Sequence, residues 1–245
     1  MTAFLGMYDT PVLQSANDAF WGEIRARLGK GSAQLTRDAD VWEIWRSPDL
    51  VFAQTCGLPY RARLHGAVQL VGTPDYDLPD CPPGYYRSVL IARESDRDDP
   101  SAYSGKTFAY NEPLSQSGWA GPMTHLRARN IAPASYLQTG AHAASVQAVK
   151  QGQADFAGID ALTWTLLSEQ GDTTGLKIIA STDPVPGLPY ITSLSMIADE
   201  VFEATQQAME ALPAPARKAL HLKALVRLPA ADYMAIPTPP PPPSG

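Results

Sequence analysis

The first seventy residues alternate between short apolar runs and stretches in which apolar residues recur every three to four positions. Phe20, Ile24 and Leu28 form the clearest helical series, and Gly29 follows them where a helix-terminating glycine is expected. Ser15 and Asn17 are suitable residue types for the N-cap of this helix. The pattern also predicts strands at Phe4–Tyr8, Leu50–Ala53 and Ala67–Val71, a helix at Ala39–Arg46 and a polar loop at Gln54–Tyr60.

The middle of the chain repeats a strand followed by a helix, which is the pattern that a parallel sheet requires. A proline-rich linker is expected at 183–189, and the tail Pro237–Gly245 is expected to be extended and exposed. Strands are predicted at Tyr85–Arg93, Thr107–Tyr110, Asp155–Asp160, Leu176–Ala180 and Ile191–Ile197, and the residues near Ser135–Gln138 are expected to form either a strand or a loop. Helices are predicted from Ser115–Gly118 to about Arg129, from His142 to Gly152, at Ala161–Gln170, at 199–211 and at 214–226.

Composition places the chain among globular proteins of one or two domains. Of its 245 residues, 44% are hydrophobic and 18% charged, which is enough apolar material for a buried core. The net charge of −6, from 19 basic and 25 acidic residues, argues against broad nucleic-acid binding, which needs a basic surface. No run approaches the roughly 20 apolar residues of a membrane span, so no direct membrane insertion is expected.

The first residues lack the basic and apolar segments of a secretion signal. The chain is therefore expected to be cytoplasmic as given, or periplasmic if it is a mature form. Cys56 and Cys81 are its only cysteines, and free thiols are favoured over a disulfide bond. Four scattered histidines have no metal-ligand spacing, so we expect neither a metal nor another cofactor.

Two segments at which predicted helices begin carry hydroxyl and imidazole groups. Ser115, Ser117 and Gly118 follow a strand, and their hydroxyl and backbone N–H donors would form an anion site at a helix start. His142, in the segment Thr139–His142, would add a donor at a neighbouring helix start. Taken alone, each segment has a plainer explanation: Ser117 caps its helix, and His142 is an ordinary exposed or core histidine.

Two further candidates also follow predicted strands. Asp160 ends a strand, where it would either face a ligand or cap the next helix. In the loop Gln54–Tyr60, Thr55 and Tyr60 would hydrogen-bond or wall a ligand, whereas Cys56 has no identifiable base and is a poor candidate nucleophile. The sequence contains no serine-hydrolase, P-loop or Rossmann motif.

Together and in this order, the segments resemble the phosphonate-type substrate-binding proteins of ABC importers, a branch of the type 2 periplasmic binding proteins. The resemblance runs from about Leu5 to Pro189. It rests on six short segments that are weak singly and specific as an ordered set. They are 54–60 (Gln-Thr-Cys-Gly-Leu-Pro-Tyr), 84–88, 103–107, 115–122, 139–142 (Thr-Gly-Ala-His) and 149–160.

The resemblance implies an α/β fold of two lobes, each a mixed sheet flanked by helices, joined by two crossover strands. The crossovers would be Tyr85–Arg93 and the stretch near Ile178–Pro189. Residues 1–86 and 187–236 would form lobe one, 87–186 lobe two, and 237–245 an exposed tail. An ABC permease is the implied protein partner.

The resemblance also implies that the two lobes close around a small anionic solute, most suitably a phosphonate or phosphate. Only Asp160 and Glu112 would be available to pair with an amine on that ligand, so the pattern does not favour an aminophosphonate. The implied ligand-binding residues are Tyr8, Thr55, Tyr60, Tyr85 (or Tyr86), Ser115, Ser117, Gly118, His142 and Asp160. We therefore expect binding without catalysis, in an ABC importer or a cytoplasmic relative. The alternative is a cytoplasmic enzyme on the same scaffold that uses His142, Asp160 and Cys56.

Overall fold

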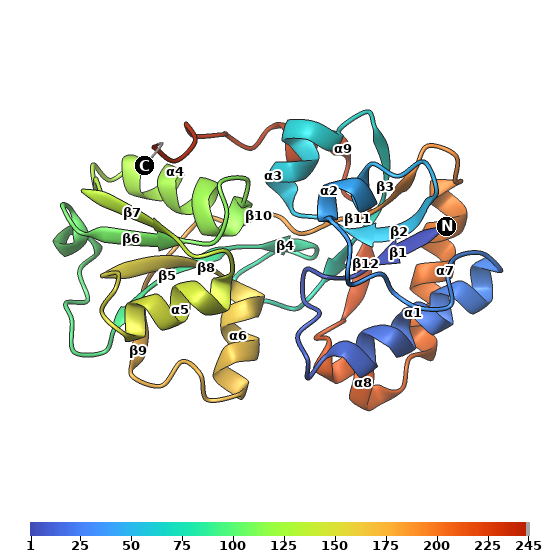
Figure 1. The fold of residues 1–245 in the computed structure, drawn as a ribbon, viewed down its shortest axis with the longest axis horizontal. Coiled ribbons are helices and arrows are strands. Elements are labelled where there is room, and N and C mark those ends of the chain that lie inside the picture. The colour runs from blue at the N-terminus through green and yellow to red at the C-terminus, as the bar shows by residue number, and fades with distance from the viewer. Residues whose placement is uncertain (244–245) are drawn as a thin grey trace. The chain divides into compact units, whose positions relative to one another are not determined.

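Residues 1–243 are described by a computed structural model in which the chain forms two units (Figure 1). Unit 1 comprises Met1–Tyr85 and Pro186–Ala235, and unit 2 comprises Tyr86–Val185 and the chain from Ile236 onward. The chain therefore passes between the units three times. Two of these passages run through the short paired strands β4 (Tyr85–Tyr86) and β10 (Val185–Pro186). Positions 244–245 of the predicted tail lie outside the described residues.

Unit 1 is built on a mixed sheet of five strands. They are β1 (Thr2–Phe4), β2 (Leu50–Gln54), β3 (Val68–Asp75), β11 (Tyr190–Ser193) and β12 (Ala224–Val226). Their order in the sheet is β1–β2–β11–β3–β12. β1 is parallel to β2, whereas β11 is antiparallel to β2 and β3, and β12 is antiparallel to β3.

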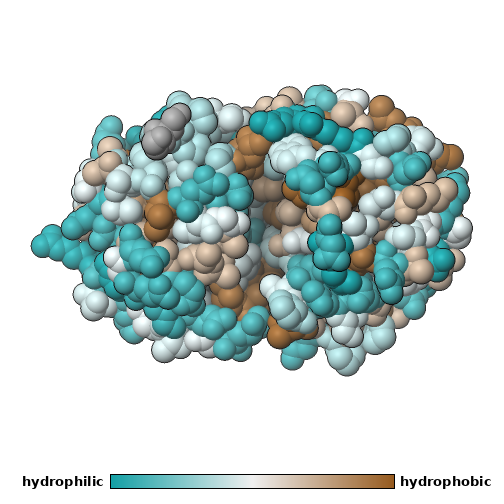
Figure 2. All heavy atoms as spheres, in the orientation of Figure 1, coloured by the Kyte–Doolittle hydropathy of each residue, from teal (hydrophilic) through white to brown (hydrophobic). Residues whose placement is uncertain are grey.

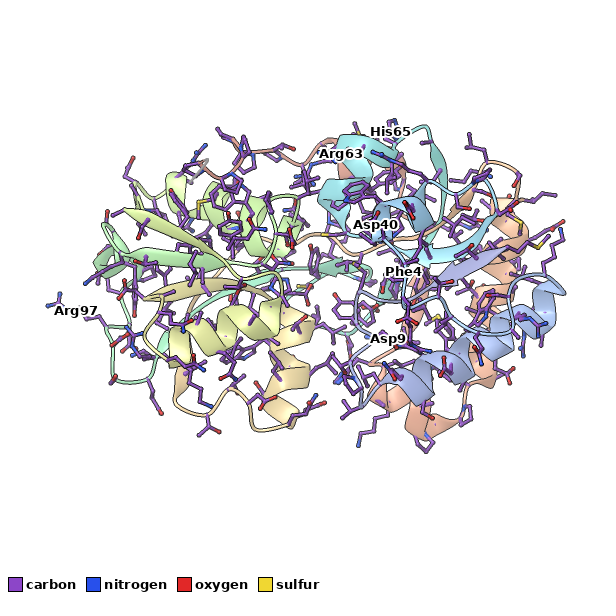
Figure 3. The ribbon with its side chains drawn as sticks, viewed as in Figure 1. Phe4, Asp9, Asp40, Arg63, His65 and Arg97 are labelled. Atoms are coloured by element: carbon purple, nitrogen blue, oxygen red, sulfur yellow. The ribbon has the colours of Figure 1, made fainter. Side chains whose placement is uncertain are left out.

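Helices of unit 1 bury aromatic side chains against this sheet. The helices are α1 (Gln14–Leu28), α2 (Val41–Trp45), α3 (Gly57–Pro59), η1 (Tyr60–Leu64), α7 (Ala198–Ala211), α8 (Ala214–Ala219) and α9 (Ala230–Met234). Trp21 of α1 stacks on Phe52 of β2 with ring centroids 6.2 Å apart. Tyr60 and Tyr233 meet edge to face at 5.3 Å in a second cluster. Asp40, labelled in Figure 3, caps α2 by accepting from two of its backbone N–H groups.

Unit 2 has a second mixed sheet, made of β5 (Ser88–Arg93), β6 (Thr107–Tyr110), β7 (Ser135–Gln138), β8 (Phe156–Asp160) and β9 (Leu176–Ser181). The order is β7–β6–β8–β5–β9. β7, β6 and β8 are mutually parallel, but β5 is antiparallel to both of its neighbours. The parallel arrangement expected from the strand–helix alternation holds for β7, β6 and β8 but not for β5, and the mixed sheet implied by the family resemblance is confirmed.

Both faces of the unit 2 sheet are buried. Val89 and Ile91 of β5 pack in a cluster with residues of α5 (His142–Lys150), while the intervening Leu90 and Ala92 pack with α4 (Gly121–Arg127). Alternate residues of one strand thus enter opposite cores, which explains its continuous apolar sequence. The remaining helical segments are η2 (Pro100–Tyr103), η3 (Gln116–Ala120) and α6 (Ala161–Glu169).

The boundaries of several predicted elements are wrong. The strand predicted at Phe4–Tyr8 is β1, which ends at Phe4. α1 begins at Gln14 without a side-chain cap, so the capping role of Ser15 and Asn17 is wrong. The amide of Asn17 donates to Asp9 instead, at 2.9 Å.

Two predicted segments adopt a different secondary structure. The polar loop Gln54–Tyr60 contains the helical turn α3 and leads into η1, because Leu58, Tyr60 and Leu64 are buried by the core. The helix predicted at 214–226 ends at Ala219, and Ala224–Val226 instead form β12 on the free edge of β3. Pairing with a distant strand overrides local periodicity in so short an apolar run.

The surface drawn in Figure 2 is largely hydrophilic, in keeping with apolar side chains gathered into the cores. Cys56 and Cys81 form no disulfide bond, as expected. Within the described part of the chain, no helix combines the length and the apolar character needed to cross a bilayer.

Candidate functional site

Three loops meet at one edge of the unit 2 sheet. Tyr110 of β6 lies opposite Gln138 of β7, and Ala109 lies opposite Ala157 of β8. Because these three strands are parallel, their carboxyl ends face the same edge, and the segments that follow Tyr110, Gln138 and Asp160 are neighbours. Four of the five candidate residues of unit 2 lie in these segments, and the fifth, Asp160, is the last residue of β8.

Backbone hydrogen bonds join the first two loops directly. The N–H of Thr139 donates to the carbonyl of Tyr110 at 2.9 Å, and the N–H of Gly140 donates to the carbonyl of Asn111 at 2.9 Å. The hydroxyl of Thr139 also donates to Tyr110, at 3.1 Å. The spacing between the two loops is thus fixed mainly by main-chain groups.

Ser115 and Ser117 have different roles in the first loop. Ser115 is the N-cap of η3, and its Oγ accepts from the N–H of Gly118 at 2.9 Å. Ser117 Oγ lies 2.9 Å from Nε2 of His142. The capping role considered for Ser117 therefore belongs to Ser115, and the Ser117 hydroxyl connects the two loops.

Two glycines let the backbone of this site pack closely. A Cβ atom on Gly118 would lie 1.8 Å from Oδ1 of Asn111, and one on Gly158 would lie 2.4 Å from Cγ of Pro122. A side chain at position 118 would displace the Asn111 side chain within the first loop, and one at position 158 would push Pro122 and the carbonyl of Gly118 away from β8. Glycine is required here by space, since neither residue has a positive φ.

His142 is the first residue of α5 and is neutral at pH 7. Its N-cap, Ala141, supplies no side-chain acceptor, so the first-turn N–H groups of α5 remain available to a ligand or water. Burial lowers the pKa of His142 to about 4, and the nearby backbone of Gly158 offsets this only in part. The imidazole of His142 is therefore neutral, and its Nε2 either accepts a hydrogen bond from the Ser117 hydroxyl or donates one to it, depending on the tautomer.

Asp160 combines the two roles considered for it. The side chain is buried, and Oδ1 accepts from the N–H of Thr163 at 2.9 Å, so the residue caps α6. It also lies at the carboxyl end of β8, opposite Ser88. Arg87 immediately precedes Ser88, and its backbone carbonyl accepts from the N–H of Ala161 at 3.1 Å, which joins the start of β5 to the start of α6.

Among the unit 1 candidates, Tyr8 and Thr55 adjoin one polar network. The ring of Tyr8 meets Tyr76 edge to face at 5.5 Å, and the Tyr76 hydroxyl accepts from Gln54 at 2.8 Å. Thr55 follows Gln54, and its buried Oγ1 forms no hydrogen bond with the described residues. Asp9, which follows Tyr8 and is labelled in Figure 3, is fixed by Arg37 at 2.6 Å.

Tyr60 and Tyr85 are already paired within unit 1. The hydroxyl of Tyr60 lies 3.1 Å from Nδ1 of His65, and burial raises the pKa of the phenol. Tyr85 donates to Asp232 at 3.3 Å, and burial and this carboxylate both raise its pKa. The structure thus brings together the five candidates of unit 2, whereas those of unit 1 occupy separate environments.

Sequence reasoning missed Asn111. Its Oδ1 is buried without a hydrogen bond to the described residues, and its main chain joins the two loops. An asparagine directly after the strand Thr107–Tyr110 was the available signal, because side chains at that position face the site edge.

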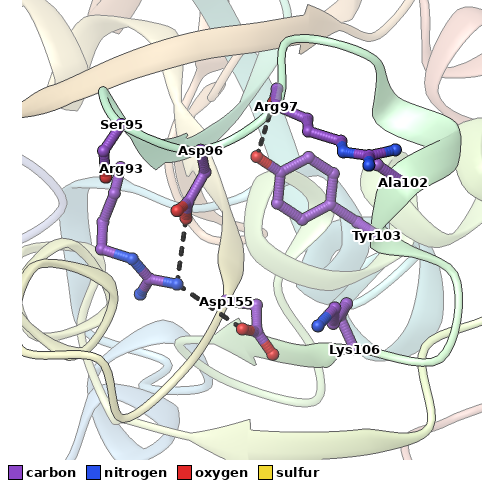
Figure 4. Close-up of a pocket in the computed structure, with 8 residues that line it drawn as sticks. All are labelled: Arg93, Ser95, Asp96, Arg97, Ala102, Tyr103, Lys106 and Asp155. Atoms are coloured by element: carbon purple, nitrogen blue, oxygen red, sulfur yellow. Dashed lines mark hydrogen bonds and ion pairs between the residues drawn. The ribbon is translucent and has the colours of Figure 1, made fainter.

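A cavity of about 510 Å³ lies at the opposite edge of the same sheet (Figure 4). It is lined by the end of β5 and by residues that precede β6 and β8. Arg93 in its wall pairs with Asp96 at 2.9 Å and Asp155 at 3.5 Å, and also donates to two backbone carbonyls. These bonds tie the sheet edge together and lie apart from the candidate site. Residues 1–243 contain no group of three or more His, Cys, Asp or Glu side chains placed to hold a metal ion.

Two mixed sheets flanked by helices, with ligand-type loops at a carboxyl edge, define a type 2 periplasmic-binding-protein fold. PhnD1 from Prochlorococcus marinus, solved with methylphosphonate, has the same fold with a TM-score of 0.74, 15% identity and coverage of 95% of this chain and 94% of its own. PA3383 of Pseudomonas aeruginosa, a binding-protein component of an ABC phosphonate transporter, has a TM-score of 0.70 and 18% identity, and the match covers 92% of this chain and 81% of PA3383. The GluR0 ligand-binding core from Nostoc punctiforme, solved with L-glutamate, has a TM-score of 0.60 and 14% identity, and the match covers 90% of this chain and 95% of the GluR0 core.

Residues 46–233 match the family model of the periplasmic phosphonate substrate-binding proteins of ABC transporters. The chain belongs to this family. Membership supports a role in binding an oxyanion rather than in catalysis, so the enzyme alternative is not favoured. No curated protein matches the chain by sequence.

Proposed function

We propose that the chain binds a small phosphorus oxyanion of the phosphonate type and presents it to an ABC permease. The observation that carries the proposal is the contact of Ser117 with His142 at the carboxyl edge of unit 2. It places a hydroxyl, an imidazole and the uncapped start of α5 around one point. A phosphonate has three oxygens, and converging neutral donors of this kind suit it.

Binding would require the Ser117 hydroxyl to redirect its hydrogen bond. In the structure the Ser117 hydroxyl and Nε2 of His142 are hydrogen-bonded to each other. An oxyanion at the start of α5 would accept from both the Ser117 hydroxyl and the first-turn N–H groups, and His142 would donate through Nε2. Asp160, which is buried at the same edge of the sheet, would then serve as the acceptor for a protonated ligand oxygen.

In unit 1, Thr55 and Tyr8 are the favoured contributors. The Thr55 hydroxyl is buried without a described partner, so a ligand oxygen would satisfy it. Tyr60 and Tyr85 remain candidates, but each would have to leave its present partner, His65 or Asp232.

Isothermal titration calorimetry with methylphosphonate, phosphite, phosphate, sulfate and methanesulfonate tests the proposal. We expect a single site that binds at least one phosphorus oxyanion and binds sulfate more weakly, because sulfate carries no proton for Asp160. Ser117→Ala should weaken binding by about tenfold, as expected for the loss of one hydrogen bond to a charged group. Ser168→Ala, on the exposed side of α6, is the matched control.

The test has clear contrary outcomes. Failure of every phosphorus oxyanion to bind would contradict the ligand class. Equal affinity of wild type and Ser117→Ala would contradict the site.

A further inference from the structure

The proline-rich tail is docked on unit 2 and is not free. Nε1 of Trp119 donates to the carbonyl oxygen of Pro240 at 3.0 Å. In Figure 1 the tail, drawn in red, runs beside α4, the helix that follows Trp119. The expectation of a wholly exposed tail therefore does not hold at Pro239 and Pro242, which are half-buried.

The pattern of burial along the tail has a period of three. Ile236, Pro239 and Pro242 are half-buried, whereas the positions between them are exposed. Five consecutive prolines at 239–243 restrict the backbone to extended conformations, and no peptide bond within residues 1–243 is cis. A polyproline II helix has three residues per turn, so a three-residue period is the sign that one of its faces lies against the protein.

The residue that receives the tail has the features of a polyproline-binding site. The Trp119 ring packs against Tyr110 at 5.0 Å and Tyr136 at 5.3 Å. Proline-rich segments bind such aromatic-lined surfaces in other proteins. Prolines offer carbonyl acceptors and no N–H donors, so the indole N–H supplies the group that the tail lacks.

Trp119 also belongs to the turn that carries the candidate anion donors. It lies in η3, directly after Ser117 and Gly118, and its backbone N–H donates to the carbonyl of Ser115 at 3.2 Å. A displacement of the indole would therefore move the Ser117 hydroxyl relative to His142.

We propose that residues 236–243 are an intramolecular polyproline ligand of Trp119, whose ring packs against Tyr110 and Tyr136, and that their docking keeps η3 in its anion-binding conformation. The coupling to anion binding rests on the proposed function, whereas the docking itself does not. Because a docked tail orders the turn before the ligand arrives, tail docking and anion binding favour each other.

The experiment uses the full chain and two kinds of variant. Trp119→Phe keeps an aromatic ring and removes the N–H donor, and Trp164→Phe in α6 is the matched control. A second variant, Pro239→Gly/Pro240→Gly/Pro241→Gly, retains the length of the tail and abolishes its polyproline conformation without touching the core. The readouts are solvent exchange of the Trp119 indole proton by NMR and affinity for methylphosphonate by calorimetry.

We expect the indole proton of wild-type Trp119 to exchange at least tenfold more slowly than in the glycine variant. Methylphosphonate should bind about fivefold more weakly to Trp119→Phe and to the glycine variant, at the low end of allosteric coupling, and normally to Trp164→Phe.

Three contrary results have different meanings. Equal indole exchange in wild type and the glycine variant would overturn the docking. Slow exchange together with unchanged affinity in both variants would overturn the coupling to the anion site. Wild-type protein that binds no phosphorus oxyanion would reject the proposed function and, with it, the coupling, while the exchange data would still decide whether the tail docks.

Discussion

Acidification should destabilise the fold through His142. In the folded chain burial lowers the pKa of this histidine from 6.5 to about 4. Between these two values the unfolded chain binds a proton that the native chain does not bind. The free energy of unfolding therefore falls as the pH falls from about 6.5 to about 4, and is flat with respect to this group outside that window.

The size of the effect follows from the same pKa values. At about 1.4 kcal/mol for each pH unit, the full window corresponds to roughly 3.4 kcal/mol. The residue is partly exposed to solvent, so roughly 2–3 kcal/mol is the expected loss. This is a large share of the roughly 5–15 kcal/mol that stabilises an ordinary protein.

Urea unfolding of wild type and His142→Gln at intervals from pH 7.5 to 4 measures this loss. The glutamine keeps a polar partner for Ser117 but does not titrate. Burial also lowers the pKa of His125, but that residue is present in both proteins and cancels in the difference. Parallel stability curves for the two proteins, or an NMR titration of His142 with a midpoint near 6.5, would refute the reasoning.

Three other substitutions test the packing described above. Gly118→Ala should lose about 1–3 kcal/mol of stability and most anion affinity, because its Cβ would overlap Asn111; urea unfolding and calorimetry would show this, and unaltered values would contradict it. Gly22→Ala in α1, where a Cβ meets no atom within 4 Å, should instead stabilise by about 0.5–1 kcal/mol in the same unfolding assay; a loss would contradict the open space assigned there. Tyr233→Phe removes the 2.6 Å bond to Thr73 and should cost about 1–3 kcal/mol, since a buried hydroxyl is left unpaired; a neutral result would mean that the pair does not stabilise the core.

The sequence was sufficient to find the unit 2 candidates because each follows a predicted strand. Ser115–Gly118 follow an apolar run and Asp160 ends another, whereas His142 follows the less distinct segment Ser135–Gln138; parallel strands bring such positions to one edge. The sequence did not predict that Ser115 caps η3 and that Ser117 contacts His142. Which hydroxyl caps a turn depends on backbone angles, and either serine has the right chemistry.

The unit 1 candidates were harder to place from sequence. Tyr60 lies in a segment whose composition resembles a loop, yet it is buried beside Tyr233 from the far end of the chain. The partner of Tyr85 is likewise Asp232, 147 positions away. Contacts between such distant positions leave no local periodicity, and the same reason explains why β12 was predicted as part of a helix.

The main-chain bonds that join the loop after β6 to the loop after β7 have a consequence for how this protein can change over generations. Neither the bond from Thr139 to Tyr110 nor that from Gly140 to Asn111 depends on the side chain at position 117 or 142. In the proposed site, mutations at those two positions would therefore alter which solute is preferred, while the main-chain bonds between the two loops would remain. The loop geometry is thus held by the main chain, whereas the proposed ligand-contacting groups are side chains. A family built in this way can acquire a new solute specificity through few substitutions.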